Sequence, residues 1–415
     1  MRATARSSIR DILGRHPVHP FPARMAPSIA LSTVSGLRHG SVVLDPMAGS
    51  GTALAIARSK GYRAIGFDVD PLAAMMTRVW TRPVNRKQVA RQATRVLKGA
   101  KTIAGQLPVR EAYPLRADPE TKEFIRYWFD DYARRQLAAL SRVIRGVKPI
   151  ATQEVLWCAF SRLIIAKQAG ASLAMDLAHS RPHRAFTRAP RKPFRGFLAS
   201  VQRVLDGCID LGQRNRGPAA KIDIGDARYL PVADKSVDLV VTSPPYLNAI
   251  DYLRCSKFTL VWMGHSVADV RAIRAASIGS EVAADAGSTL TPFLDKLRLR
   301  PSLAPRMRRI LQRYAEDTDR AIREVVRVLK PKGRVVYVVG ENTIRGTYIR
   351  TGQLVTALAR EAGLRLTKRR YRELPDNRRY LPPPGVGRAT LDTRMRREVI
   401  LTFRRSGRAS QPSNR

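Results

Sequence analysis

The sequence has few cysteines and no long apolar run. Its three cysteines, Cys158, Cys208 and Cys255, are widely spaced and form no Cys-x-x-Cys pair. This spacing excludes a disulfide framework and a cysteine-based zinc site, and it is typical of a reducing compartment, so we expect a cytoplasmic location and no metal. No apolar stretch approaches the roughly 18 residues of a membrane-spanning helix, and no basic amphipathic anchor stands out, so we expect no membrane partner.

Acidic residues are also scarce. The 415 residues include 33 Asp and Glu against 75 Lys and Arg, which gives a formal net charge of +42. An imbalance this large says nothing about the fold, but it strongly favours a polyanionic partner. We therefore rank nucleic acid well ahead of a membrane surface. The length and the hydrophobic content of 44% allow one large domain with insertions, or two domains.

Two signatures of phosphate-binding nucleotide sites are missing near the N-terminus. Residues 41–52 are typical of a strand followed by a Gly-rich turn, and a helix and a second strand ending at Asp68 follow. The Walker pattern requires Gly-Lys-Ser/Thr, whereas Gly51 is followed by threonine and alanine. The dinucleotide fingerprint requires a third glycine at the position of Leu54. The turn is therefore a weak match to either phosphate site.

The same turn suits a cationic nucleotide-like ligand. Gly49 and Gly51 let a ligand approach the backbone closely, and the helix that follows offers free N–H groups at its start. Asp45, at the end of the first strand, would repel a pyrophosphate but could hold an ammonium group. Asp68 lies 17 residues after Gly51, close to the spacing at which an acid binds ribose hydroxyls. An ammonium, a ribose and an adenine together indicate S-adenosylmethionine.

A second stretch combines a buried strand with a rigid turn. The apolar run at residues 237–241 predicts a buried parallel strand. Pro244 and Pro245 stop it, because neither can donate to a ladder and each fixes φ near −65°. Open α/β sheets place their chemistry at such carboxyl ends of strands. We expect a nucleobase to stack on Tyr246 with its edge at Ser243, although Pro-Pro alone more often marks a plain structural turn.

The two stretches together resemble one enzyme family. They read Asp-Pro-Met-Ala-Gly-Ser-Gly-Thr at residues 45–52 and Ser-Pro-Pro-Tyr at residues 243–246. The pair resembles the amino-methylating DNA methyltransferases, which modify cytosine N4 or adenine N6, and His-Pro-Phe-Pro at residues 19–22 resembles their helix lead-in. The resemblance covers about half of the chain. It implies S-adenosylmethionine as cofactor and double-stranded DNA as substrate, and it leaves a cognate restriction endonuclease open as a partner.

The resemblance also implies roles for individual residues. Asp226, in the Gly-Asp-Ala that follows a predicted strand, is the candidate near the adenine amino group. The expected cofactor contacts are Phe21, Asp45, Pro46, Ala48, Gly49, Ser50, Gly51, Thr52, Asp68 and Asp226. The expected catalytic residues are Ser243, Pro244, Pro245 and Tyr246.

The chemistry of the second turn suits an amino group. The lone pair of an exocyclic amino group is delocalised into the ring, and Ser243 with the Pro244 carbonyl can accept its hydrogens and make the nitrogen more nucleophilic. The sulfonium methyl then lies in line for displacement, so catalysis is largely positioning and electrostatics. The proton would leave to solvent or through the turn. The base must leave the duplex, and Tyr246 would replace its lost stacking.

The cysteines and the first motif residue bear on the alternative functions. Ring-carbon methylation requires a cysteine nucleophile, usually after proline, whereas the three cysteines follow Trp157, Gly207 and Arg254. Serine at the first motif position resembles the cytosine-N4 group more than the adenine group, so cytosine is favoured. An RNA amino-methyltransferase, or an inactive nucleic-acid-binding protein with a methyltransferase-like core, remains the alternative function.

The periodicity predicts an α/β fold with a Rossmann-like seven-stranded methyltransferase sheet. Predicted strands lie at residues 41–45, 62–68, 221–227, 237–241, 334–339, 364–371 and 398–403. We expect the cofactor-binding half of the catalytic domain at residues 1–80, a helical insertion at 81–219, the catalytic-motif half at 220–264, a loop-rich insertion at 265–305, the C-terminal part of the catalytic sheet at 306–405 and a disordered tail at 406–415.

The helical insertion contains a basic segment. Helical spacing of apolar residues predicts helices at residues 124–147, 153–169 and 197–211. Between the last two, cations alternate with aromatic residues and prolines. A run of cations is usually only a solvated face, but the charge of the whole chain favours nucleic-acid contact here. The candidate contacts are Arg181, Arg184, Arg188, Arg191, Lys192 and Arg195.

Overall fold

The chain divides into two compact units in a computed structural model. The model describes residues 8–21, 24–175, 177, 182–212, 217–247, 253–280, 293–294, 305–344, 347–374 and 397–406. Unit 1 contains Met1–Ser32, Ala48–Ile224 and Tyr252–Ile273, and unit 2 contains Thr33–Met47, Gly225–Asp251 and Arg274–Arg415. The predicted tail lies, from residue 407 onward, outside the described residues.

One sheet contains seven strands: β1 (Val42–Asp45), β2 (Arg63–Asp68), β7 (Ala220–Ile224), β8 (Val237–Thr242), β9 (Leu329–Gly340), β12 (Leu364–Glu373) and β13 (Arg397–Arg405). Their order is β12-β13-β9-β8-β1-β2-β7. Strand β8 pairs in parallel with β1 and β9, and β2 with β7, whereas β13 is antiparallel to β9 and β12. This sheet confirms the predicted Rossmann-like α/β fold, and each strand overlaps one predicted from the sequence.

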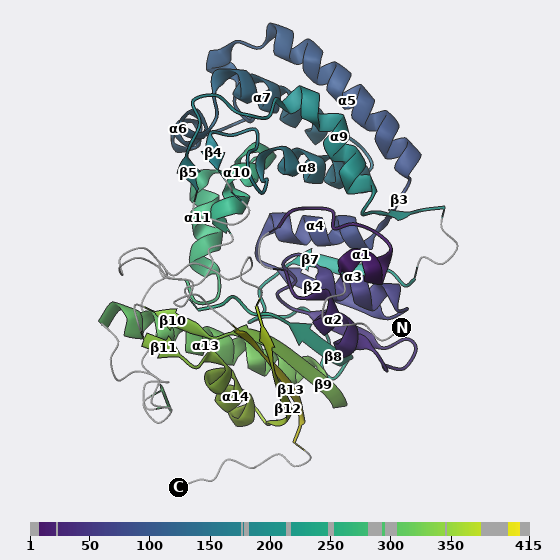
Figure 1. Cartoon of the computed structure of the whole chain (residues 1–415), viewed down its shortest axis with the longest axis vertical. Helices are drawn as coiled ribbons and strands as arrows, with labels where there is room; N and C mark the ends of the chain where they lie inside the picture. Colours follow the sequence, from purple (N-terminus) through teal and green to yellow (C-terminus); the bar gives the residue numbers. More distant parts are fainter. Residues whose placement is uncertain are drawn as a thin grey trace. The chain divides into compact units, whose positions relative to one another are not determined.

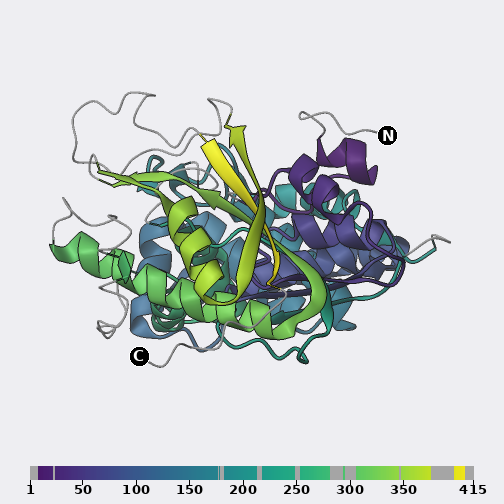
Figure 2. The same ribbon diagram turned by 90° about the horizontal axis from the view of Figure 1, so that it is seen from below.

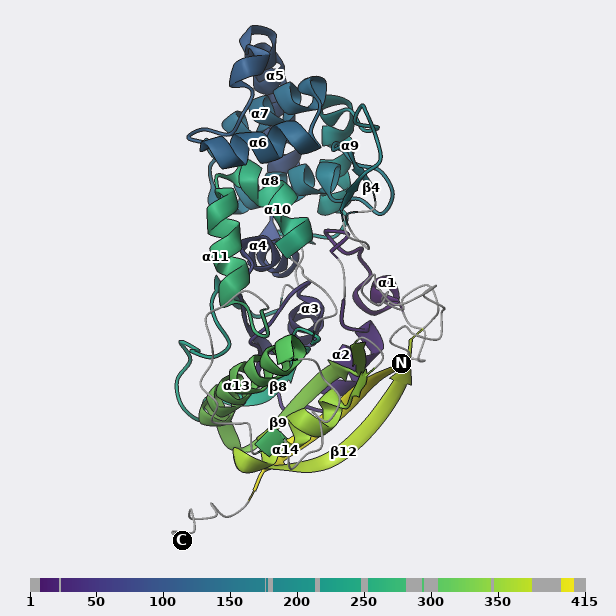
Figure 3. The same ribbon diagram turned by 90° about the vertical axis from the view of Figure 1, so that its left-hand side faces the viewer.

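Unit 1 is mainly helical. Its longer helices are α3 (Thr52–Ser59), α4 (Pro71–Thr81), α5 (Arg86–Gln106), α6 (Pro119–Trp128), α7 (Asp131–Arg145), α8 (Ile150–Ile164), α9 (Pro193–Leu205) and α10 (Leu253–Met263). Helix α5 lies outermost in Figure 1 and packs on α7, α8 and α9. Helix α10 packs against α4, α7 and α8 (Figure 3). Aromatic rings contribute to the contact with α8, since Trp262 of α10 meets Phe160 of α8 edge-on with the ring centroids 6.4 Å apart.

Four predictions of secondary structure are wrong in detail. The predicted helices 153–169 and 197–211 are too long, because α8 ends at Ile164, α9 ends at Leu205 and Ile209–Asp210 forms the short strand β6. Residues 124–147 were expected to form one helix, but α6 ends at Trp128 and α7 begins at Asp131. The cause is Asp130, whose carboxylate accepts from the Ala133 N–H at 2.9 Å and so caps a new helix. Residues 265–305 were expected to be loop-rich, but α11 (Val267–Ala276) is a helix. Ser266 caps it by accepting from the Asp269 N–H at 2.9 Å.

Unit 2 places two helices with the longer strands of the sheet. They are α13 (Pro305–Val328) and α14 (Thr351–Glu361). Helix α14 packs on β9, β12 and β13 and lies beside α13 (Figure 2). In β8, Val237, Leu239 and Val240 are fully buried, as expected for a strand covered on both faces.

Short elements complete the described part of the chain. They are α1 (Ile9–Leu13), α2 (Pro27–Val34), η1 (Val109–Glu111), β3 (Pro83–Val84), β4 (Ala174–Met175), β5 (His183–Arg184), β6 (Ile209–Asp210), β10 (Asn342–Ile344) and β11 (Thr347–Ile349). Among the described helices, none is both long enough and apolar enough to cross a bilayer.

Candidate active site

The Gly-rich turn of unit 1 is attached to the end of β2 by backbone hydrogen bonds. The Ala48 N–H donates to the Phe67 carbonyl at 2.9 Å, and the Gly49 N–H donates to Asp68 Oδ2 at 2.7 Å. The Thr77 hydroxyl donates to the Gly49 carbonyl at 3.3 Å. The turn is therefore held from both sides, by the neighbouring strand β2 and by helix α4.

The two glycines of this turn are required by its geometry. Gly49 has φ of 50° and Gly51 has φ of 74°, values that favour glycine. A Cβ on Gly51 would lie 2.6 Å from Thr77 Oγ1, so the close approach of α4 adds a second reason. Gly51 is the N-cap residue of α3, and the buried Thr52 begins that helix. The first backbone N–H groups of α3 have no acceptor within the helix, so they are the candidates in this turn to bind a ligand.

Two acids lie at the end of β2. Asp68 is half-buried, and its Oδ1 accepts from the Asp70 N–H at 2.9 Å while its Oδ2 holds Gly49. Burial raises the pKa of Asp68 above its usual range. Each oxygen of an ionised carboxylate has a further lone pair, so Asp68 can still accept from ribose hydroxyls.

Asp70 is a residue that the sequence interpretation missed. It is 3% exposed, caps α4 by accepting from the Leu72 N–H at 2.8 Å, and accepts from the Ser256 hydroxyl of α10 at 2.5 Å. Burial, followed by the neighbouring Asp68 charge, raises the pKa of Asp70 to about 7. An aspartate directly before Pro71 at the start of an apolar helix was the available signal.

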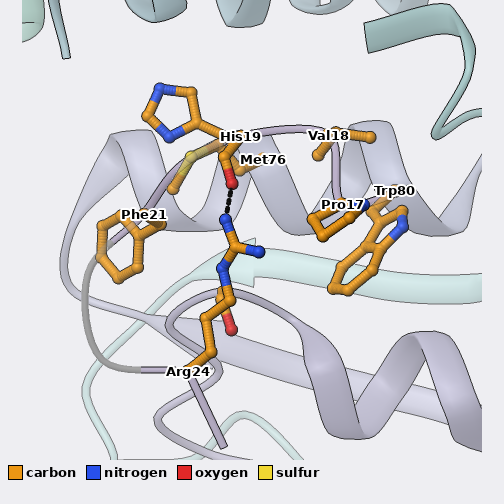
Figure 4. Close-up of a pocket in the computed structure, with 8 residues that line it drawn as sticks. Pro17, Val18, His19, Phe21, Arg24, Met76 and Trp80 are labelled. Atoms are coloured by element: carbon orange, nitrogen blue, oxygen red, sulfur yellow. Dashed lines mark hydrogen bonds between the residues drawn. The ribbon is translucent and has the colours of Figure 1, made fainter. Parts of the chain in front are cut away.

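A small pocket of unit 1 adjoins the Gly-rich turn. In it, the Arg24 guanidinium donates to the His19 carbonyl and lies between Phe21 and Trp80 (Figure 4). Phe21 Cε1 is 3.9 Å from the position that a Cβ on Gly49 would take. The structure therefore brings two predicted cofactor contacts, Phe21 and Ser50, to one pocket. Its lining residues are Pro17, Val18, His19, Phe21, Arg24, Ser50, Met76 and Trp80.

Unit 2 brings the ends of β1 and β8 to one edge of the sheet. The parallel register pairs Leu44 with Val240, so Asp45 and Ser243 follow at neighbouring carboxyl ends. Asp45 and Pro46 are buried, and the Asp45 carboxylate accepts from the Met47 N–H at 3.2 Å. Two stretches that are far apart in sequence are thus adjacent at the edge where doubly wound sheets bind their ligands.

Side-chain hydrogen bonds hold the proline turn. The Ser243 hydroxyl donates to the Val338 carbonyl of β9 at 3.0 Å. The Tyr246 hydroxyl donates to Glu398 Oε1 at 2.9 Å, and Arg372 Nη1 donates to Glu398 Oε2 at 2.6 Å. Tyr246 and Glu398 are buried, as are Pro244 and much of Pro245. Glu398 and Arg372 were not expected at this turn, because β13 and β12 reach it only through the tertiary fold.

Asp226 has a different immediate partner from the one expected. Its two carboxylate oxygens accept from the Arg228 side chain at 2.6–3.0 Å, and Arg228 Nη1 also donates to Asp317 at 2.6 Å. Hydrogen bonds to Asp226 raise the pKa of Arg228. The adenine contact of Asp226 stays a prediction, and the carboxylate would have to share its lone pairs with Arg228.

The basic segment is fixed on the helices of unit 1. Its backbone is bound to α7, since Asp130 Oδ2 accepts from the Ala189 N–H at 2.5 Å and Gln136 Oε1 from the Phe194 N–H at 3.0 Å. Arg188 and Arg195 are exposed. Arg191 is half-buried and donates to the Arg162 carbonyl at 3.1 Å, and its contact with nucleic acid stays a prediction. Arg181 lies outside the described residues.

Two exposed tyrosines accompany this segment and were missed in the sequence. Tyr127 is 53% exposed with the Arg184 guanidinium 5.4 Å from its ring centroid. Tyr132 is 57% exposed with the Lys192 ammonium 5.7 Å from its ring centroid. Each pair is a cation–π contact on an open surface. No sequence spacing signals these pairs, because the tyrosines precede the cations by about 60 residues.

Comparison with known proteins agrees with the methyltransferase sheet. No protein-family model matches this chain. The chain is 22% identical to the type II methyltransferase M.MvaI of Kocuria varians, over 94% of this chain and 90% of that protein. This match extends over nearly the whole chain and confirms the predicted resemblance to the DNA methyltransferases.

Two solved structures show weaker similarity. A protein from Thermus thermophilus that carries the description DNA modification methylase is 21% identical with a TM-score of 0.23, over 46% of this chain and 54% of that chain. A SAM-dependent methyltransferase from Methanosarcina mazei is 10% identical with a TM-score of 0.31, over 89% of this chain and 94% of that chain. These scores are too low to establish a shared fold, so the fold assignment depends on the strand order itself.

Proposed function

We propose that this protein is an S-adenosylmethionine-dependent DNA methyltransferase that methylates an exocyclic amino nitrogen of a flipped base, with cytosine N4 preferred to adenine N6. The observation that carries the proposal is the edge of the sheet in unit 2. There a serine oxygen and a proline carbonyl, Ser243 and Pro244, end one strand, and Asp45 ends the strand beside it. The whole-chain similarity to a type II methyltransferase supports it.

The turn at residues 45–52 would bind the cofactor. Backbone N–H groups at the start of α3, and the lack of side chains at Gly49 and Gly51, suit a ligand that approaches the main chain. Asp68 would accept from the ribose hydroxyls, and Asp45 would attract the ammonium of the methionine part. Phe21 and Ser50 would complete the cofactor contacts, together with the remaining residues of the turn. Bound in this way, the cofactor supplies an activated methyl group.

The turn at residues 243–246 would bind the target base. Ser243 and the Pro244 carbonyl accept hydrogens from its amino group and draw the lone pair towards nitrogen. Tyr246 would stack on the extruded base, and the stiff prolines would keep the acceptors in position during displacement. Transfer requires that the methyl donor and this turn meet in the active arrangement.

Carbon methylation fits the cysteines poorly. Such chemistry needs a thiolate close to the base. Cys158 and Cys208 are buried, and burial raises their pKa, to about 12 for Cys208. The Cys255 Sγ contacts the Leu177 carbonyl in the interior of unit 1. Cys158 and Cys208 are therefore poor thiolate nucleophiles, which supports methylation of nitrogen.

A direct assay tests the activity and identifies the base. The purified chain is incubated with S-adenosylmethionine labelled on its methyl group and with duplex DNA or RNA, and the digested nucleosides are separated by mass. We expect N4-methylcytosine in DNA. N6-methyladenine would reverse the base preference, label in RNA alone would favour an RNA enzyme, and the absence of a thermal shift with the cofactor would favour an inactive core. Ser243→Ala should lose turnover, whereas Ser236→Ala, which alters a surface turn of the same unit, should not.

The surface formed by Tyr127, Tyr132, Arg184, Arg188, Lys192 and Arg195 is proposed to contact the DNA backbone. Exposed cations beside exposed aromatic rings are typical of nucleic-acid surfaces, since the cations bind phosphates and the rings contact sugars or bases. The hydrogen bonds from the Ala189 and Phe194 N–H groups to Asp130 and Gln136 hold the backbone that carries these cations, which lowers the backbone entropy lost on binding.

Salt dependence tests this surface. Arg188→Ala with Arg195→Ala should reduce the slope of log Kd against log salt by about 1 to 2, because each phosphate contact contributes close to one unit. The matched control is Arg91→Ala with Arg95→Ala, which removes two exposed cations from α5 of the same unit. Equal slopes for the two double variants would contradict a specific role for the surface.

A further inference from the structure

The hydrogen-bond directions around Ser243 are fixed by two groups that can only accept. The Val338 carbonyl accepts the single hydrogen of the Ser243 hydroxyl at 3.0 Å. The Glu398 carboxylate accepts the single hydrogen of the Tyr246 hydroxyl at 2.9 Å. The two hydroxyl oxygens are 3.4 Å apart, so Tyr246 can turn towards Ser243 only by leaving Glu398. As a result, the Ser243 oxygen keeps its lone pairs for another donor.

Glu398 is held in this role by the strands around it. It lies on β13, opposite Gly340 of β9 and opposite Arg372 of β12. It is 7% exposed, and Arg372 binds its second oxygen at 2.6 Å. A buried carboxylate with a guanidinium on one oxygen must present the other oxygen to its remaining partner, because a carboxylate has no hydrogen to donate.

We infer that Glu398 is a positioning residue for methyl transfer, which sets the hydrogen-bond direction of Ser243 through Tyr246. This inference rests on the proposed function. The amino group of a cytosine or adenine must donate its hydrogens to become nucleophilic, so the serine must present an acceptor. Glu398 ensures this by drawing the Tyr246 hydrogen away from Ser243. Arg372 acts one step further out, by keeping the carboxylate in place.

An isosteric amide reverses the chain of hydrogen bonds. In Glu398→Gln, Arg372 still needs an acceptor, so the amide oxygen faces Arg372 and the amide NH2 faces Tyr246. The Tyr246 oxygen then accepts, and its own hydrogen turns to the Ser243 oxygen. One lone pair of the Ser243 oxygen is then no longer available to accept from the target amino group, although no side chain changes its size.

A double-mutant cycle tests this mechanism. We expect Glu398→Gln to lower kcat by about tenfold to a hundredfold with little change in KM for the cofactor, because one hydrogen bond to the reacting group is lost. The same substitution in a Tyr246→Phe background, where no phenolic hydrogen exists, should lower kcat by less than about threefold. The pair Glu398→Gln with Arg372→Met should also regain kcat, because the amide oxygen is then free to turn to Tyr246.

The outcomes separate this inference from the function on which it rests. The cofactor-induced thermal shift of each variant first shows that it is folded. A wild-type chain without methyl transfer would overturn the proposed function and the inference with it. An active wild type with equal kcat in Glu398→Gln would overturn the inference alone. An equal loss with and without the Tyr246 hydroxyl would do the same, since it would assign Glu398 a purely structural role.

Discussion

The Gly-rich turn of unit 1 and the proline turn of unit 2 are held rigid in different ways. The first consists of glycines at positive φ whose main chain is bound by Asp68 and Thr77. The second consists of prolines whose neighbouring hydroxyls are bound by the Val338 carbonyl and Glu398. The N–H groups of Ala48, Gly49 and Gly51 already have acceptors, so the donors proposed for the cofactor are those at the start of α3. The proline turn offers acceptors, which suit an amino group.

The difference predicts separate consequences for substitution. Added side chains and altered acids should affect unit 1 through cofactor affinity and stability. Altered hydrogen-bond directions or lost rings should affect unit 2 through turnover. The comparison would fail if variants of unit 1 changed turnover alone, or if variants of unit 2 changed cofactor affinity. It would gain support if the two kinds of effect stayed separate.

The largest effect is expected from the buried acid of unit 1. The folded chain holds the Asp70 proton up to about pH 7, whereas the usual value is 3.8. Between these values the folded state binds more protons, so stability should fall as the pH rises from about 4 to 7. Asp70→Asn keeps the helix cap but has no proton to lose. The fall in unfolding free energy between about pH 4 and 7 should therefore be smaller in this variant, by on the order of 2–4 kcal/mol, in unfolding titrations.

An exposed helix cap serves as the control for Asp70. Hydrogen bonds from Thr121 lower the pKa of Asp118 at the start of α6. The contribution of Asp118 to the free energy of unfolding is present above its ordinary pKa and disappears as the pH falls. Asp118→Asn should therefore leave the pH dependence of stability between about pH 5 and 7 unchanged. A flat profile for the wild type over that range would show that Asp70 is ionised when folded.

Loss of the ring at the proline turn is the next largest effect. Tyr246→Ala should lower turnover on DNA by about a hundredfold, because stacking of one base is worth about 1–3 kcal/mol. Cofactor affinity should be unchanged in calorimetry. The control is Tyr229→Ala, which removes a tyrosine that is 68% exposed in the same unit. Normal turnover of Tyr246→Ala would argue against base stacking there.

A methyl group added to the Gly-rich turn should act on stability and binding together. Gly51→Ala would combine unfavourable φ with a Cβ only 2.6 Å from Thr77 Oγ1. We expect a loss of about 2 kcal/mol in unfolding free energy relative to Gly61→Ala, which has φ of 84° but open space around it. Equal melting temperatures for the two variants would mean that α4 does not constrain the turn.

The smallest effect is expected at Asp68, the acid proposed to bind the ribose. Asp68→Ala removes the proposed acceptor for the cofactor and the hydrogen bond that holds the Gly49 N–H. We expect cofactor affinity to fall by about tenfold, the equivalent of one charge-assisted hydrogen bond, while DNA binding stays intact. Calorimetry and a gel-shift assay measure the two quantities. If DNA affinity fell and cofactor affinity did not, Asp68 would be a DNA contact and not a cofactor contact.

All seven strands of the sheet could be predicted because their signals are local. Buried parallel strands appear as short β-branched runs between turn residues, as at residues 237–241. Helix boundaries depended on single capping residues, and Asp130 therefore divided a segment that reads as continuous apolar periodicity. Helix α5 was not singled out, because its buried face consists largely of alanine and valine among many cations.

The sequence proposes candidate site residues where they are adjacent along the chain, and it gives no signal for contacts that form only when strands come together. The turns at residues 45–52 and 243–246 carry their own chemistry. Glu398 meets Tyr246 only because β13 lies between β9 and β12. The partner of Asp226 is Arg228, which is close to it in sequence. Arg228 also donates to a second acid, Asp317, which lies on α13. Pairings of that kind require the tertiary arrangement of the elements.

The position of β13 has a consequence for biosynthesis. This strand follows every other strand of the sheet in sequence, yet it lies between β9 and β12. The ribosome therefore makes the Gly-rich turn early, and it makes β13, which carries Glu398, after the other six strands of the sheet. A growing chain can bury its first helices, but it cannot close the sheet or orient its serine until translation of that strand is complete. On the proposed function, copies that end before β13 should therefore lack methyl transfer.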